Sequence, residues 1–109
     1  MPFTFEISPA EQGLQHFRLL DGQGNTLILG GEYETKELTE SVIQKVRVGS
    51  MMSQFIAKCA TPDGGMFFVI KDESGTVLAK SELFENEMDF NNTLHKVRES
   101  ACIAQISYS

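Results

Sequence analysis

The sequence is short of cysteine, on which small disulfide-rich and zinc-binding proteins depend. Its 109 residues include only two cysteines, Cys59 and Cys102, with no Cys-x-x-Cys or Cys-His spacing that would indicate a zinc site. Two cysteines in a chain without a secretion signal seldom form a disulfide. We therefore expect two buried free thiols and exclude a disulfide scaffold.

Basic residues and long apolar runs are also scarce. Nine lysines and arginines stand against fifteen aspartates and glutamates, and the net charge is −6. Because phosphate backbones are bound by clustered Lys and Arg, nucleic acid is an unfavourable partner. No stretch approaches the ~18 apolar residues of a membrane span, and the N-terminal residues lack the pattern of a signal peptide. We expect a cytoplasmic bacterial protein that has no contact with a membrane.

What the sequence does contain is an internal repeat. The tripeptide Lys45-Val46-Arg47 recurs 51 residues later as Lys96-Val97-Arg98. The same offset aligns Phe17 with Phe68, Asp21 with Asp72, Gly24 with Gly75, Leu27 with Leu78 and Tyr33 with Phe84. We therefore predict a single domain over residues 1–109, made of two repeats at about 3–52 and 53–107.

Each repeat shows the same order of elements. Apolar and polar residues alternate in the predicted strands, and glycine-containing turns join them at 21–25 and 72–75. Helical spacing follows Thr35 and Asn86, which we predict as N-caps. The predicted strands cover residues 3–8, 15–20, 26–29, 53–60, 66–71, 76–81 and 102–107, and the helices 36–48 and 87–99. Gly30-Gly31 is predicted to end the third strand, and Gly49 to end the first helix.

A helix with one apolar stripe needs a sheet to cover it. The simplest arrangement is an α+β fold in which one mostly antiparallel sheet carries both helices on one face. The first copy reads Phe17-Arg18-Leu19-Leu20-Asp21-Gly22-Gln23-Gly24, and the second Phe68-Val69-Ile70-Lys71-Asp72-Glu73-Ser74-Gly75 followed by Ser81-Glu82-Leu83-Phe84. This pattern, with Val-Arg at each helix end, resembles the YegP-like family of small bacterial tandem-repeat proteins of unknown function, from which the chain departs at Gly30-Gly31. The resemblance covers about residues 3–107 and implies two strand-strand-strand-helix-strand units that share one sheet and exchange their closing strands.

No set of residues stands out as catalytic. His16 lies in a predicted strand and His95 in a predicted helix, and they do not occupy equivalent repeat positions. There is no Gly-x-Ser-x-Gly elbow and no phosphate loop. We therefore expect no enzymatic activity, no cofactor and no metal.

The second strand of each repeat supplies the first candidate contact. If the side chains of Phe17 and Phe68 face the helices, Phe67 and Val69 face away from them, together with His16 and Arg18. Large apolar side chains on an open sheet face are unusual. Either a partner, such as a protein or a second copy, or the chain termini should cover this face.

The charges of the repeated tripeptide supply the second candidate. Lys45, Arg47, Lys96 and Arg98 suit the negative ends of the two helix dipoles, but they could also contact an anion. The sequence thus favours a noncatalytic protein-interaction or self-association module. The alternative is a small-molecule or nucleic-acid binder that uses the basic residues at the helix C-termini.

Overall fold

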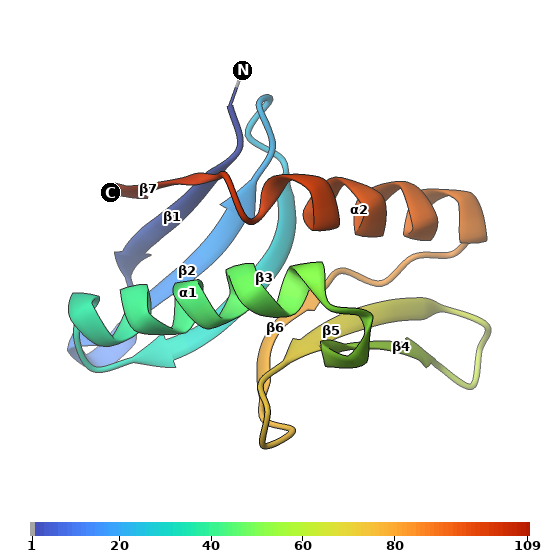
Figure 1. Cartoon of the computed structure of the whole chain (residues 1–109), viewed down its shortest axis with the longest axis horizontal. Helices are drawn as coiled ribbons and strands as arrows, with labels where there is room; N and C mark the ends of the chain where they lie inside the picture. Colours follow the sequence, from blue (N-terminus) through green and yellow to red (C-terminus); the bar gives the residue numbers. More distant parts are fainter. Residues whose placement is uncertain (1) are drawn as a thin grey trace.

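Seven strands form one mixed sheet in the computed structural model, which describes residues 2–109 (Figure 1). The sheet order is β4-β5-β6-β3-β2-β1-β7. The strands are β1 (Thr4–Pro9), β2 (Gln15–Leu20), β3 (Thr26–Tyr33), β4 (Ile56–Ala60), β5 (Met66–Lys71), β6 (Val77–Ser81) and β7 (Gln105–Tyr108). Five neighbouring pairs are antiparallel, and β7 runs parallel to β1. The predicted α+β class with a mostly antiparallel sheet is confirmed.

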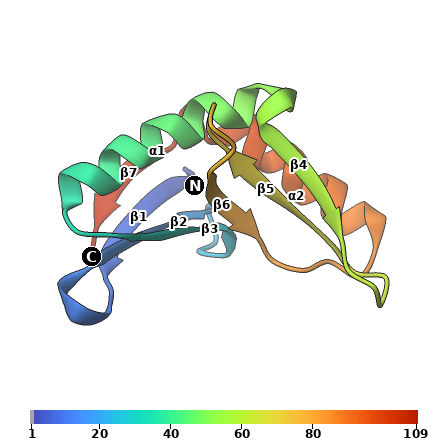
Figure 2. The same ribbon diagram turned by 90° about the horizontal axis from the view of Figure 1, so that it is seen from below.

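Two helices, α1 (Lys36–Met51) and α2 (Glu87–Ser100), pack against the sheet. Both begin where the sequence predicts. Thr35 Oγ1 accepts a hydrogen bond from the Leu38 N–H at 3.0 Å, and Asn86 Oδ1 accepts one from the Asp89 N–H at 2.8 Å. Helix α1 crosses much of the sheet and contacts β1, β2, β3, β5 and β6, as Figure 2 shows.

Aromatic side chains at equivalent repeat positions lie at the centre of the core. Phe17 and Phe68 are fully buried. Phe17 stacks on Tyr33 with ring centroids 6.4 Å apart, and Phe68 meets Phe90 edge to face at 5.8 Å. The valines of the repeated tripeptide, Val46 and Val97, are also fully buried, so each helix is fixed to the core at this position.

The two glycine positions predicted to end elements do not end them. β3 continues through Gly30 to Tyr33, because Gly30 lies under the Phe17 ring. A Cβ at Gly30 would lie 2.5 Å from Phe17 Cδ1 and closer still to two other ring atoms, so only glycine fits this strand position. Gly49 is likewise inside α1, where a Cβ would lie 2.8 Å from Ile70 Cγ2. Both glycines permit close packing rather than a turn.

The last strand is shorter than predicted. α2 ends at Ser100, residues 101–103 form a turn, and β7 begins at Gln105. Cys102 therefore lies exposed in that turn rather than buried in a strand, whereas Cys59 is half-buried; both are free thiols.

The two edges of the sheet differ. β7, from the end of the chain, pairs with β1, near its beginning. At the opposite edge, no strand within residues 2–109 lies beyond β4 (Figure 1).

Candidate functional site

One row of paired residues crosses the whole sheet on the face opposite the core. Its members, from one edge to the other, are Ser107, Glu6, Arg18, Leu29, Lys80, Val69 and Ala57. Their side chains point away from the core because their strand neighbours Phe17, Leu19, Phe68 and Ile70 are fully buried in it. This row runs through two of the four residues predicted to contact a partner.

The β1–β2 end of the row is polar and internally paired. Arg18 donates to Glu6 Oε1 from Nε at 3.0 Å and from Nη2 at 2.8 Å. In the neighbouring row, His16 Nε2 and Ser8 Oγ are hydrogen-bonded at 2.8 Å. Arg18 and His16 are half-buried, and their polar groups are already hydrogen-bonded within the sheet, so this end of the row has its polar groups satisfied without a partner.

The β4–β5 end of the row is apolar. Val69 is flanked in register by Ala57 and Lys80, and it is only 7% exposed. Phe67 pairs with Cys59 and is half-buried, while the Lys80 ammonium lies 5.8 Å from the centre of its ring. Leu29 on β3 is 51% exposed. We call Leu29, Ala57, Cys59, Phe67 and Val69 the outer patch.

Leu29 is the member of the outer patch that the sequence does not reveal. It belongs to the apolar run Leu27-Ile28-Leu29, in which every residue could be buried. Only the pairing of Leu29 with Arg18 and Lys80 places it on the outer face.

The four predicted anion contacts do not form one site. α1 extends to Met51, so Lys45 and Arg47 lie before its last turn, and only Arg98 occupies the last turn of its helix. Helix-end charge compensation is therefore the wrong explanation for Lys45 and Arg47. Arg47 Nη2 instead donates to the Ala104 carbonyl at 2.6 Å, and its guanidinium lies 5.8 Å from the centre of the Phe5 ring.

The two lysines of the repeated tripeptide face different hairpins. The pKa of Asp72 is lowered mainly by its hydrogen bond from Ser74, with a small contribution from the charge of Lys45. The pKa of Asp21 is lowered mainly by the Asn25 N–H, with a small contribution from Lys96. Because these hairpins lie at opposite ends of the molecule in Figure 1, Lys45 and Lys96 belong to separate surfaces.

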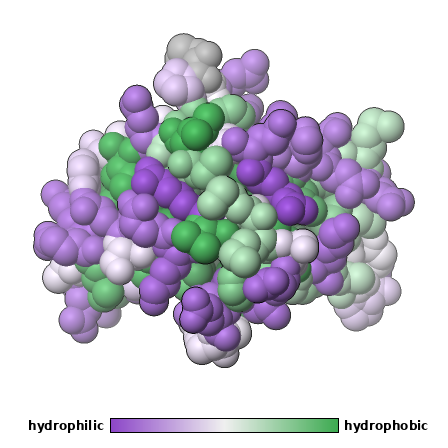
Figure 3. All heavy atoms as spheres, in the orientation of Figure 1, coloured by the Kyte–Doolittle hydropathy of each residue, from purple (hydrophilic) through white to green (hydrophobic). Residues whose placement is uncertain are grey.

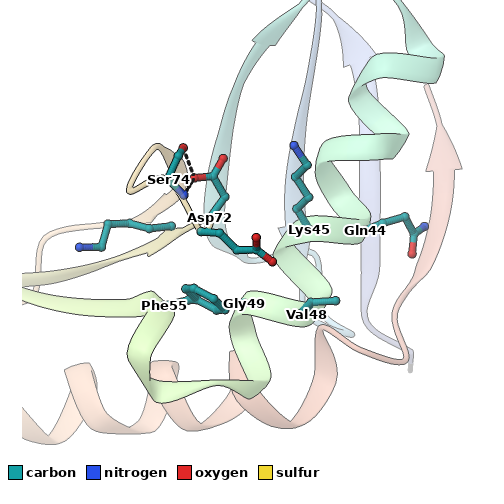
Figure 4. Close-up of a pocket in the computed structure, with 9 residues that line it drawn as sticks. Gln44, Lys45, Val48, Gly49, Phe55, Asp72 and Ser74 are labelled. Carbon is teal, nitrogen blue, oxygen red and sulfur yellow. Dashed lines mark hydrogen bonds between the residues drawn. The ribbon is translucent and has the colours of Figure 1, made fainter.

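Lys45 borders an open groove with a volume of about 560 Å³. Figure 4 shows that its walls come from α1, from the turn that carries Phe55, and from the β5–β6 hairpin. Val48, Gly49 and Phe55 form an apolar base, and the charged rim consists of Lys45, Lys71, Asp72 and Glu73. The sequence gives little sign of this groove, because Phe55 is brought beside α1 by the short 3-10 turn Ser53–Phe55.

A second apolar surface lies on the side of the molecule that Figure 3 shows. Hydrophobic residues form a band down its centre between hydrophilic flanks. Val48, Met51 and Met52, at the end of α1, have exposed side chains, as does Ile103 after α2. These exposed apolar side chains are an alternative contact surface to the outer patch.

The described residues offer no metal site and no membrane span. Over residues 2–109, no group of three or more His, Cys, Asp or Glu side chains could hold a metal ion. In the same range neither helix has the length and apolar character needed to cross a membrane.

Proteins of the same fold and of similar sequence occur in bacteria. The chain is 23% identical over 107 residues to UPF0339 protein PA0329 of Pseudomonas aeruginosa, which covers 98% of this chain and 97% of that one. Its fold matches yegP of Escherichia coli, a protein of unknown function, with a TM-score of 0.90, 20% identity, and coverage of 100% of this chain and 94% of yegP. It also matches UPF0339 protein SO3888 of Shewanella oneidensis, with a TM-score of 0.91, 19% identity, and coverage of 99% and 92%.

No family model matches the sequence. The resemblance to YegP-like proteins that the repeated motifs predict is nevertheless confirmed by these full-length similarities. The relatives supply a fold but no activity.

Proposed function

We propose that this protein is a noncatalytic interaction module whose outer patch binds another protein. The observation that carries the proposal is the change in chemistry along the row that crosses the sheet. The Glu6–Arg18 ion pair at one end is replaced by Ala57 and Val69 at the other.

The proposal treats the two halves of the chain as copies of one unit, with both helices on the sheet face opposite the outer patch. Its support is the central pair of strands, in which Leu29 pairs with Lys80, while Ile28 pairs with Ser81 and Gly30 with Ala79. An offset of 51 exchanges the two strands of this pairing and leaves its register unchanged, which supports a pseudo-twofold axis between β3 and β6. Glu6 then corresponds to Ala57, and Arg18 to Val69.

The two halves of the outer face therefore differ although they share a backbone. A face that only meets water could keep the ion pair in both halves. The second half instead carries the half-buried Phe67 ring beside a buried valine, and exposed Leu29 on β3 extends this apolar surface across the axis. Apolar clusters of this kind mark contact sites. A second copy is a poor occupant because each chain carries a net charge of −6.

The proposal can be tested by placing a photocrosslinking residue at different positions of the chain and comparing the adducts. We expect p-benzoylphenylalanine in place of Phe67 to form discrete adducts with another protein in cells, because the ring would lie inside the contact. Adding Leu29→Glu should remove most of this adduct, since a carboxylate in the patch would have to be desolvated on binding.

Two other positions serve as controls for this experiment. Met88, on α2, is 73% exposed and should give no discrete adduct. Met51 reports on the exposed apolar side chains at the end of α1. Adducts from Met51 but not from Phe67 would move the contact to the end of α1 and overturn the assignment to the outer patch.

The groove beside Lys45 supports a second candidate function, the binding of a small anionic ligand with an apolar body. Its volume of about 560 Å³ lies within the usual range for small-molecule sites. Phe55 and Val48 provide apolar contact, and Lys45 and Lys71 provide positive charge.

A chemical-shift titration at low salt tests the groove. We expect aromatic carboxylates and nucleotides to shift the amide signals of residues 44–49 and 71–74, and Lys45→Glu to weaken the binding about tenfold, because a favourable charge becomes a repulsive one. Lys96→Glu, at the equivalent position of the other helix, is the matched control and should have no effect. Shifts that are absent or spread evenly over the surface would rule this candidate out.

A further inference from the structure

The pairing of β7 with β1, at one edge of the sheet, is a template for how a strand could pair with the free edge of β4 at the other. With an offset of 51, β4 corresponds to most of β1. The outer side of β1 is occupied by β7, which runs parallel to it and pairs Phe5 with Ile106, Glu6 with Ser107 and Ile7 with Tyr108. The outer side of β4 has no such strand among residues 2–109.

The chain cannot fill this place in the way it fills the first. The residues equivalent to β7 are 54–57, and they are already used in the 3-10 turn and in the beginning of β4. Residues 2–109 therefore leave no equivalent segment to pair with the outer side of β4, which is open to a strand from a partner. Such a strand would lie directly beside Ala57 and Cys59, which belong to the outer patch.

A second copy pairing through its own β4 fits this edge poorly. Lys58 is the central residue of β4 and is exposed. In a centred antiparallel pair of two β4 strands, Lys58 would lie directly opposite its own copy, and like charges in this position are destabilising. The same lysine would favour a strand that carries an acidic residue.

We propose that the β4 edge binds an extended segment of a partner protein by strand addition, parallel to β4, with an apolar residue beside Ile56 and an acidic residue beside Lys58. The inference rests on the proposed interaction function and specifies its mode. The pairing of β7 with β1 gives both positions. Ile106 pairs with Phe5, which is equivalent to Ile56. Tyr108 pairs with Ile7, which is equivalent to Lys58. Backbone hydrogen bonds provide affinity in strand addition, and alternate side chains provide specificity.

The residue of the added strand that lies between these two positions faces the outer patch. It corresponds to Ser107 of β7, which pairs with Glu6. Glu6 is equivalent to Ala57. A small or apolar residue suits this position because Ala57, Val69 and Phe67 lie next to it. Strand addition would thus make the β4 edge and the outer patch one continuous surface.

The test uses peptides built on residues 104–109 of this chain, Ala-Gln-Ile-Ser-Tyr-Ser, acetylated and amidated to remove terminal charges. One peptide keeps this sequence, one carries Tyr108→Glu, and one carries Tyr108→Lys. Each is titrated into the full-length protein while amide chemical shifts are followed. We expect the Glu peptide to shift the signals of β4 and to bind about three- to fivefold more tightly than the parent, as one cross-strand charge pair allows.

Exchanging the charge on the protein makes the test specific. Lys58→Glu should reverse the order, so that the Lys peptide binds best, while Lys80→Glu on the neighbouring β6 should leave the order unchanged. The inference is overturned if no peptide shifts the β4 signals at millimolar concentration, or if Lys58→Glu leaves the order of peptide affinities unchanged. It is also overturned if the shifts fall on β1 because the peptide displaces β7. In each of these cases, discrete Phe67 adducts that are lost with Leu29→Glu would still support the interaction function.

Discussion

Gly30→Ala should destabilise the fold by about 3 kcal/mol, near the upper end for an overpacked core. The added Cβ would overlap the ring of Phe17, which is fully buried. That ring has little freedom to move, because it stacks on Tyr33 and meets Phe5 at a centroid distance of 6.1 Å. Denaturant unfolding followed by circular dichroism measures the change in the free energy of unfolding.

Gly31→Ala is the matched control on the same strand. Its Cβ would meet the Tyr33 hydroxyl at 3.2 Å, and this is the far end of a side chain that can shift. The expected change is within about 0.5 kcal/mol, as for most surface substitutions. Equal effects at both glycines would contradict the steric explanation.

A double mutant identifies the partner of the clash. Phe17→Leu removes the ring atoms that the new Cβ would overlap, so Gly30→Ala should cost less in the Phe17→Leu background than in the wild type. The coupling energy should exceed 1 kcal/mol, as it can for two residues in direct contact. Strictly additive effects would show that Gly30 is required for another reason, such as its backbone conformation.

Gly30 also shows where the sequence stops being informative. Periodicity, N-caps and the internal repeat predict where both helices begin, where β2 and β5 lie and which phenylalanines form the core, because these are local signals. A glycine pair at the end of an apolar run reads as a turn under the same local rules. That Gly30 instead continues the strand depends on the neighbouring strand, which places the Phe17 ring over it.

In the candidate site, too, local sequence signals predict some features, and others depend on neighbouring strands. Strand alternation correctly predicts that Phe67 and Val69 lie on the face opposite Phe68. It does not predict that Val69 is 93% buried or that Leu29 is exposed, because both depend on Lys80 and the pairing of β3 with β6. The free β4 edge is equally invisible in the sequence, where β4 and β1 have the same place in their repeats.

Arg47 and Arg98 occupy the same place in the two copies of the repeated tripeptide, but they should respond differently to substitution. Arg47→Ala should lower the free energy of unfolding by about 2 kcal/mol, because it removes a charged donor from the buried Ala104 carbonyl. Arg98→Ala should change it by no more than about 0.5 kcal/mol, since Arg98 is exposed and only its interaction with the helix dipole is lost.

Arg47→Met separates the two roles of the arginine side chain. Methionine keeps an apolar stem over the Phe5 ring but cannot donate to Ala104, so it should recover only the packing part of the loss. Equal costs at Arg47 and Arg98 would restore helix-end charge compensation as the common role of both arginines. The expected asymmetry has a functional consequence, because an arginine committed to the Ala104 carbonyl is not free to bind an anion. Of the two cations in the first tripeptide, Lys45 alone then remains for the groove, which is why its substitution, and not that of Arg47, tests ligand binding there.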